Sequence, residues 1–242
     1  SKNNEIGNNI ANSLGLCIGD LGFYFANNIL LEAYSKNVNI YKVLQYYNDV
    51  VIKTIKGEII DVKLPYDIQY ENSNKFNEQD IIEIYRLKTA WYTITGPFCL
   101  GCLLAGAKES DTKKFEPILE NIGIAFQIKD DIIGIFGDEN ITGKSTNSDI
   151  SEFKQTILYS YVHNNKEYLD ELNKYYGKHD ITDDESNIVR KIFKDSGALD
   201  YANKIMNKLF DESIKQIKEL HLSKKYEDIL LGFISYLTIR QK

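Results

Sequence analysis

Phe126-Gln127-Ile128-Lys129-Asp130-Asp131-Ile132-Ile133-Gly134-Ile135-Phe136-Gly137-Asp138 is the stretch that decides how this chain folds. Its apolar residues, with those from Phe115 onward, fall on nearly every side of a helix, and a helix that is apolar all round is buried. Yet Asp130 and Asp131 lie inside it, and a carboxylate is almost never fully buried without a partner because removing the ion from water is costly. The pattern predicts a buried central helix whose two aspartates meet something positive.

The partner of these aspartates has two interpretations at this point. Gln127 lies three residues before Asp130 and four before Asp131, so all three side chains share one face of the helix. Carboxylate oxygens suit a hard cation, and magnesium typically takes one or two carboxylates, with water and substrate phosphate completing its shell. A buried salt bridge is the simpler alternative, and the residues alone leave both open.

Composition excludes several classes of protein. The chain has 242 residues, 43% of them hydrophobic, and a net charge of −6 with acidic and basic residues mixed, so nothing indicates a nucleic-acid partner. The three cysteines lie in apolar segments, which is typical of thiols in a reducing, cytoplasmic compartment. The longest apolar run, 97–107, is too short to cross a bilayer, so we expect no membrane span. We predict a single all-α domain over 1–242.

Helical periodicity and turn signals predict the order of the elements. A polar loop is expected at 65–76 with Asn77 as the following N-cap, a kink or break at Gly96-Pro97, and a central helix that starts at Asp111 or Thr112 and ends at Gly137. Asp183-Asp184 opens a helix, so capping explains that pair. The other helices are expected at 6–34, 40–63, 151–163, 165–175, 183–194, 196–219 and 225–240.

Small residues recur along one side of the first helix, at Ala11, Gly15, Gly19, Gly22 and Ala26. Each glycine inside a helix costs about 1 kcal/mol relative to alanine, so the stripe needs a reason. Either another helix packs very close, or the stripe lines a cavity that must stay open for a ligand. The sequence does not separate these two alternatives.

Lysines supply candidate positive charge. Lys88 lies among apolar residues, where its head can reach solvent or, with Thr89 beside it, can bind phosphate. Lys144 lies in the polar loop 138–149 and Lys154 follows it, both close to the acidic end of the central helix. The loop is no nucleotide-binding P-loop, because it follows a helix and its glycine spacing is wrong. The basic chain end at Arg240 suits a helix C-terminus or a cap over a phosphate site.

At this point the residues resemble a family. The run F-Q-I-K-D-D-I-I-G-I-F-G-D-x-x-x-T-G-K-S at 126–145 is similar to the second aspartate-rich motif of trans-polyprenyl diphosphate synthases, which include farnesyl and geranylgeranyl diphosphate synthases. Gly19-Asp20, Gly57-Glu58-Ile-Ile-Asp61, Tyr85-x-x-Lys88-Thr89-Ala and Gly197-Ala198-Leu199 resemble further elements of that family in the same order. The resemblance covers nearly the whole chain.

The resemblance implies an all-α isoprenoid synthase bundle around a central cavity. It implies an enzyme that joins isopentenyl diphosphate to an allylic diphosphate and releases a longer trans-prenyl diphosphate, farnesyl or geranylgeranyl. The magnesium ligands would be Asp130 and Asp131. The lysines Lys88, Lys144 and Lys154 would bind diphosphate oxygens, with Gln127 and Thr89 near the cation or substrate phosphate. A homodimer is the common assembly of the family.

This sequence departs from the family pattern at several places. Gly134 stands where a third aspartate is common, and Glu58 stands where glutamine is usual. No counterpart of the family's first aspartate-rich motif, which precedes the Gly19-Asp20 helix, is present, so the domain is expected to lack its N-terminal helices and that motif. A non-catalytic regulatory subunit of a prenyl diphosphate synthase is therefore the alternative function. A terpene cyclase of the same fold fits less well, because its typical second metal motif is not seen.

Overall fold

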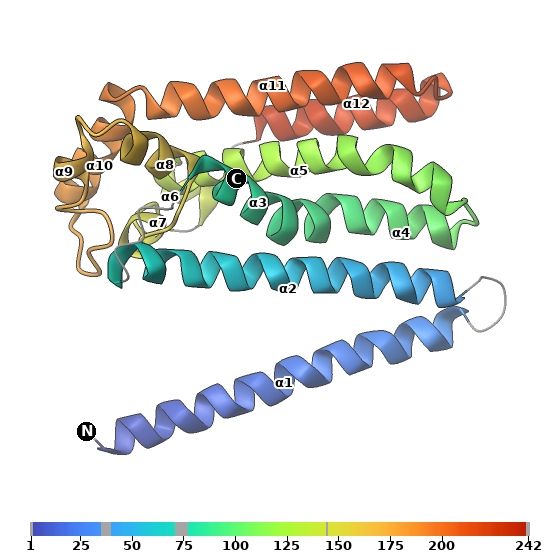
Figure 1. Ribbon diagram of the computed structural model, residues 1–242, viewed down its shortest axis with the longest axis horizontal. Helices are drawn as coiled ribbons and strands as arrows, with labels where there is room; N and C mark the ends of the chain where they lie inside the picture. Colours follow the sequence, from blue (N-terminus) through green and yellow to red (C-terminus); the bar gives the residue numbers. More distant parts are fainter. Residues whose placement is uncertain (1, 35–39, 71–76, 144, 241–242) are drawn as a thin grey trace.

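The computed structural model describes residues 2–34, 40–70, 77–143 and 145–240, and within them every regular element is a helix, as predicted (Figure 1). The described elements are α1 (Lys2–Tyr34), α2 (Ile40–Tyr70), α3 (Glu78–Ile84), η1 (Tyr85–Thr95), α4 (Gly96–Leu104), α5 (Glu109–Phe136), α6 (Glu139–Thr142), α7 (Ser148–Ser151), α8 (Ile157–Asn164), α9 (Leu169–Leu172), α10 (Asp183–Asp195), α11 (Ala198–Glu219) and α12 (Lys224–Ile239).

The central helix of the prediction is α5. It packs between η1 and α11 and buries side chains on several sides, among them Ile122, Ala125 and Ile128. It ends at the predicted cap, Gly137, whose N–H donates to the carbonyl of Ile133. Its start was predicted wrongly: α5 begins at Glu109 after an extended Lys108, with no side-chain cap, because its first turn carries the acidic residues that suit a helix N-terminus.

The segment before Gly96-Pro97 is a π-helix, η1, which runs directly into α4 instead of breaking. Two glycines let the neighbouring helices approach it closely. A Cβ atom built on Gly57 of α2 would lie 2.5 Å from the backbone nitrogen of Lys88, and one on Gly123 of α5 would lie 2.4 Å from Ala90. The π-helix is therefore packed between α2 and α5 at points where neither helix has a side chain. π-helical turns are found frequently at functional sites.

Helix α2 is longer than predicted. The polar loop expected from Pro65 does not begin there, because the helix continues through this proline to Tyr70. Leu64 and Ile68 pack against the hydrophobic core, and Lys63 pairs with Asp67 at 2.7 Å across the same turns. Tertiary packing thus outweighs the loss of the one hydrogen bond that proline cannot make. The remainder of the expected loop, 71–76, lies outside the described residues.

The caps that open two later helices follow the prediction. Asn77 caps α3 reciprocally with Asp80, and Thr182 caps α10 reciprocally with Glu185, so the acidic pair behind Thr182 is explained by capping. The helices predicted at 151–163 and 165–175 are shorter, as α8 and α9, because Phe153 takes a left-handed conformation and the chain turns before Ile157. The last three helices lie close to the predicted ranges.

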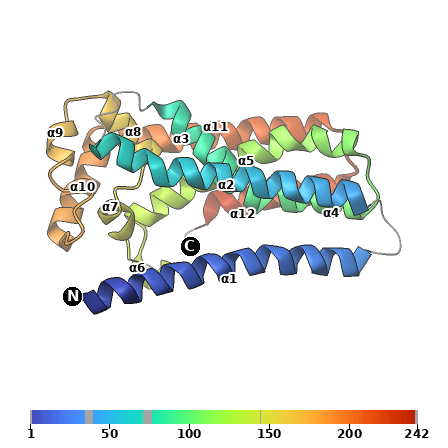
Figure 2. The ribbon, with the colours of Figure 1, turned by 60° about the horizontal axis from the view of Figure 1, so that its bottom comes forward.

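Helix α1 contacts α2 but otherwise diverges from the bundle in both views (Figures 1 and 2). Its large apolar side chains are exposed, and a Cβ atom on Gly15, Gly19 or Gly22 would meet no described atom within 4 Å. The residues from Ile10 to Glu32 are long and apolar enough to cross a membrane, with mean hydropathy 1.4 and none buried. Signal sequences and the core helices of soluble proteins have the same length and hydropathy. The predicted absence of a membrane span therefore stays a prediction.

Candidate functional site

Asp131 is the centre of a buried network on α5. Its side chain is 2% exposed, and its Oδ1 atom accepts from Gln127 Nε2 at 2.9 Å and pairs with Lys154 Nζ at 3.0 Å. Its Oδ2 atom accepts from the hydroxyl of Tyr85, which in turn accepts the backbone N–H of Ile157 at 3.1 Å. At Asp131 the structure therefore contains the buried salt bridge that was the simpler alternative in the sequence.

The charges of this network stabilise one another. Burial raises the pKa of the Asp131 carboxyl group, and the Lys154 ammonium and the Tyr85 hydroxyl oppose that shift. Burial disfavours the charge on Lys154, but Asp131 and Asp149 outweigh it and raise the lysine's pKa. The pKa of Tyr85 rises because the hydroxyl is buried and faces a carboxylate. Asp131 and Asp149 thus favour the charged form of Lys154 and hold its ammonium group at a fixed position.

Asp130 has a different environment from its neighbour. Its side chain is 47% exposed, and its Oδ1 atom pairs with Arg240 Nη2 at 2.6 Å. The guanidinium carbon of Arg240 lies 4.2 Å from the centroid of the Phe126 ring. Both aspartates therefore meet a cation, as the sequence requires, but only Asp130 is accessible to a ligand from solvent.

Thr89 and Gln127 extend the network from α5 to the π-helix. Thr89 Oγ1 donates to Gln127 Oε1 at 2.6 Å, and Gln127 then donates from its amide nitrogen to Asp131. Four of the predicted site residues, Thr89, Gln127, Asp131 and Lys154, are therefore linked in one hydrogen-bonded chain. The close approach of α5 to η1 at Gly123 places the first two within reach of each other.

Lys88 lies beside this chain but bonds in another direction. Its Nζ atom pairs with Asp61 at 2.6 Å and Glu58 at 3.1 Å, both on α2. Burial lowers the pKa of Lys88, and the two carboxylates outweigh burial and raise it. Sequence reasoning placed Glu58 and Asp61 in an element that resembles the family but gave neither residue a role at the site. That element, with its two acidic residues three positions apart on one helix face, was the available signal.

Asp149 is a third residue that sequence reasoning missed. A Cβ atom on Gly134 would lie 2.5 Å from Asp149 Oδ2, so the side chain of Asp149 occupies the space left by this glycine. Gly134 follows Asp130 by one helical turn, on the same face. Asp149 also pairs with Lys154 at 3.2 Å. The signal that could have found it is the absence of a side chain at Gly134, inside an otherwise crowded buried helix.

The donors near Asp130 fit magnesium in their chemistry. Among the described residues, no three acidic, histidine or cysteine side chains converge to form a complete protein cage for a metal. Magnesium rarely uses such a cage, because it keeps several waters and binds through one or two carboxylates plus phosphate oxygens. Asp130 supplies one accessible carboxylate on α5. The carboxylate of Asp149 lies beside Gly134, one helical turn further along α5, and supplies the second.

The loop between α5 and α8 is anchored by Arg190 of α10. Its guanidinium donates to the carbonyl of Ile135 at 2.7 Å and to Thr146 Oγ1 at 2.8 Å. Glu139 accepts from the backbone N–H of Thr146 at 2.7 Å. These contacts fix the loop that carries Asp149. Lys144, the remaining predicted site residue, lies outside the described residues.

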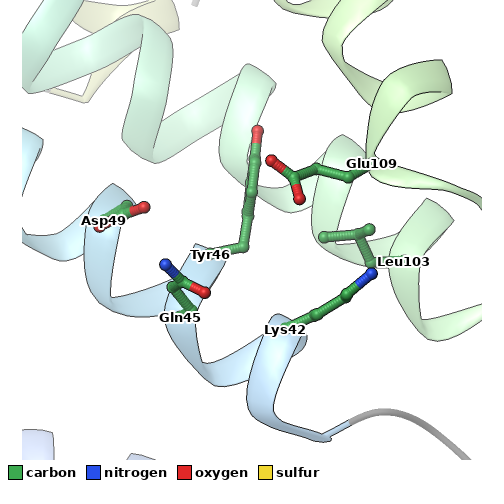
Figure 3. A pocket seen from close by; sticks show the side chains of 6 residues that line it. All are labelled: Lys42, Gln45, Tyr46, Asp49, Leu103 and Glu109. Atoms are coloured by element: carbon green, nitrogen blue, oxygen red, sulfur yellow. The ribbon is translucent and has the colours of Figure 1, made fainter.

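Two hollows lie elsewhere on the bundle. An apolar groove of about 260 Å³ is bounded by α1, α2, η1 and α4, and its lining residues are Phe23, Tyr47, Val50, Val51, Thr54, Ile55, Tyr92, Pro97 and Leu100. A polar pocket of about 60 Å³ is lined by Lys42, Gln45, Tyr46, Asp49, Leu103 and Glu109 (Figure 3). On α5, Glu109 and Asp130 are about 30 Å apart at 1.5 Å per residue, so the polar pocket is separate from the candidate site.

The fold and site define an all-α protein with an acidic and lysine-rich centre on its buried helix. The sequence matches the family model "Polyprenyl synthetase" over residues 4–195. The chain belongs to this family.

Named relatives agree with that assignment. The geranylgeranyl diphosphate synthase of Saccharolobus solfataricus is 31% identical over 203 residues, which cover 81% of this chain and 59% of the relative. The geranylfarnesyl diphosphate synthase of Aeropyrum pernix is 32% identical over 170 residues, covering 67% of this chain and 48% of the relative. The chain thus spans about half to three-fifths of the length of these two relatives.

Solved structures support the fold. A geranylgeranyl pyrophosphate synthase from Corynebacterium glutamicum, crystallised with isoprenyl diphosphate and magnesium, superposes with a TM-score of 0.82 at 23% identity. The match covers 92% of this chain and 62% of that one. The predicted isoprenoid synthase bundle is therefore confirmed.

Proposed function

We propose that this protein is a short-chain trans-prenyltransferase that condenses isopentenyl diphosphate with an allylic diphosphate to give farnesyl or geranylgeranyl diphosphate. The observation that carries the proposal is the hydrogen-bonded chain from Thr89 through Gln127 and Asp131 to Lys154, beside an accessible Asp130. This arrangement fixes cationic and polar groups next to a solvent-accessible carboxylate, as ionisation of a diphosphate ester requires. The named relatives, which are diphosphate synthases, support the substrate class.

The proposed metal is Mg²⁺, held by Asp130 with Asp149 as the second carboxylate. When bound, it would act as a Lewis acid on the diphosphate oxygens. Asp131, predicted as a ligand from the sequence, has both oxygens engaged by protein donors. Its role in this proposal is to hold Lys154 in place.

The protein's residues then carry the reaction as follows. As the bond between C1 of the allylic substrate and its diphosphate oxygen breaks, negative charge grows on the leaving group. Lys88, Lys144 and Lys154 stabilise that charge as diphosphate ligands. The double bond of isopentenyl diphosphate attacks C1, which leaves a positive charge on C3 of that substrate. A proton then passes from its C2 to the released diphosphate, and the electrons of that C–H bond form the new double bond. The Thr89 and Gln127 oxygens face the positive charge that develops between these events.

The growing hydrocarbon needs a dry path, and the apolar groove between α1, α2, η1 and α4 is the proposed one. It contains aromatic and aliphatic side chains, among them Phe23, Val50 and Leu100. Two of its walls, α2 and η1, are the helices that carry Asp61 and Lys88. Substitutions of groove residues by larger ones are therefore expected to shorten the product.

The test is an elongation assay on the full-length gene product with labelled isopentenyl diphosphate, an allylic diphosphate and Mg²⁺. Asp130→Ala is expected to abolish elongation, while Asp211→Ala, at an exposed position of α11, serves as the matched control and retains it. Failure of the wild-type protein to elongate alone, with activity appearing only when a homologous subunit is added, would replace this proposal by the regulatory-subunit alternative.

We also propose that the protein acts as a homodimer in the cytoplasm. The exposed apolar surface of α1 and the free thiols of Cys17, Cys99 and Cys102 support this. Light scattering on the full-length protein and fractionation of its source cells test the two parts. A monomer at working concentration would contradict the first, and recovery with the membrane fraction would contradict the second.

A further inference from the structure

Arg240 forms an ion pair with Asp130, the carboxylate proposed to hold the metal. It follows α12, and its guanidinium reaches 110 residues back in sequence to pair with Asp130 at 2.6 Å. It also covers the ring of Phe126, and its side chain is only 12% exposed although Asp130 is 47% exposed. A pair that is bonded, stacked and largely buried on the arginine side differs from an ordinary flexible surface ion pair.

The same carboxylate cannot serve Arg240 and a divalent cation equally well. Arg240 bonds to Oδ1 of Asp130, and a cation bound by this carboxylate would lie within a few ångströms of the guanidinium. Two like charges at that separation, on a partly desolvated surface, repel each other strongly. We propose that Arg240 is a latch on the metal site: it neutralises Asp130 when metal is absent, and a divalent cation must displace it to bind. This inference rests on the proposed function, because it takes Asp130 as the metal ligand.

The geometry permits this displacement. Arg240 has already left the helical conformation, with φ −56° and ψ 138°, so it can swing away without breaking the turns of α12. Its Nε atom is buried and has no hydrogen-bond partner among the described residues, so the latched state leaves one donor unsatisfied there that release would return to water. The cation and Arg240 compete for the Asp130 carboxylate. The Arg240–Asp130 pair therefore lowers the affinity for the cation by the same factor by which the bound cation destabilises the pair.

The first test is calorimetric titration of the full chain with Mn²⁺ and with Mg²⁺, without substrate. Arg240→Gln is expected to bind the cations at least about fivefold more tightly than wild type, the lower end of typical coupling between sites. Arg240→Lys, which keeps the charge, should fall between them. Lys224→Gln is the matched control, because it removes one positive charge from α12, the helix that Arg240 follows. Lys224 pairs with Asp228 at 2.8 Å and not with Asp130. It should bind like wild type.

The outcomes separate the latch from the metal site. If Arg240→Gln binds Mn²⁺ no more tightly than wild type, the latch is overturned while the proposed metal site stands. If neither protein binds a divalent cation without substrate, the latch is overturned, while the Asp130→Ala elongation assay decides separately whether Asp130 holds the metal beside substrate phosphate. Equal gains in Arg240→Gln and Lys224→Gln would also overturn the latch, because they would reflect general charge only.

A second test does not need a substitution at Arg240. Trypsin cuts after arginine, so the rate of cleavage following Arg240 reports whether its side chain is latched. Mn²⁺ should accelerate this cleavage in the wild-type protein, and Asp130→Asn should accelerate it without metal. Cleavage unaffected by either change would contradict the proposal. Cleavage at surface lysines such as Lys224 provides the internal control for trypsin activity.

Discussion

Replacing Tyr85 by phenylalanine tests the role of the buried network in stability. The hydroxyl of Tyr85 donates to Asp131 and accepts the N–H of Ile157, and the side chain is 3% exposed, so water does not replace either bond. Loss of a hydrogen bond to a charged group costs about 1.5–3 kcal/mol, and an unsatisfied buried N–H about 1–3 kcal/mol. Because relaxation recovers part of this, we expect a loss of about 3 kcal/mol, or a fall in Tm of about 6–12 °C for a chain of this length.

The measurement is a urea titration and a thermal melt followed by circular dichroism. Tyr92→Phe is the matched control, because it removes the same hydroxyl from the same π-helix at a side chain that is 67% exposed. It should change stability by less than about 0.5 kcal/mol, as surface substitutions do. If Tyr85→Phe is no less stable than Tyr92→Phe, the argument that this hydroxyl joins α5, η1 and α8 is wrong.

Further predictions concern close packing and charge. Gly123→Ala should destabilise by about 1–3 kcal/mol or more through overpacking against η1, whereas Gly101→Ala, with open space around it, should be neutral or stabilising in the same urea titration. Gly134→Ala should weaken Mn²⁺ binding in calorimetry, because its methyl group displaces the Asp149 carboxylate; unchanged affinity would count against that carboxylate as a ligand. The hydrogen bond from Arg86 lowers the pKa of Glu83, so this pair contributes stability at neutral pH that is lost as pH falls below the usual glutamate value. Glu83→Gln should therefore flatten the stability profile as pH falls through and below the usual glutamate range, and an unchanged profile would refute this.

The central helix illustrates what local pattern can predict. Apolar residues on every side of 115–136 require burial, and a glycine at 137 ends a helix readily, so both features were predicted and confirmed. The N-terminus of the same helix was missed, because Asp111 and Thr112 are good caps in isolation while the structure begins the helix at Glu109. Several residues compete for a helix start, and neighbouring packing selects among them.

Pro65 and the segment before Gly96 show where local rules fail for a physical reason. A proline usually ends a helix, but α2 continues because Leu64 and Ile68 gain burial against the core. Two glycines on other helices, Gly57 and Gly123, allow those helices to pack closely against the π-helix η1. No pattern within 85–95 contains that information.

The sequence by itself determined that the chain is helical, that Asp130 and Asp131 require positive partners, and which family the chain resembles. Only the tertiary structure decided which cation meets which carboxylate: Lys154 is buried against Asp131, and Arg240 covers Asp130. It also decided that Asp149 fills the space beside Gly134. The free-energy cost of burying a carboxylate depends on the residue and on the apolar pattern of its own helix, so the need for a positive partner can be predicted from the local sequence. Partners that approach from other elements are selected by how the helices pack, and sequence spacing does not encode that choice.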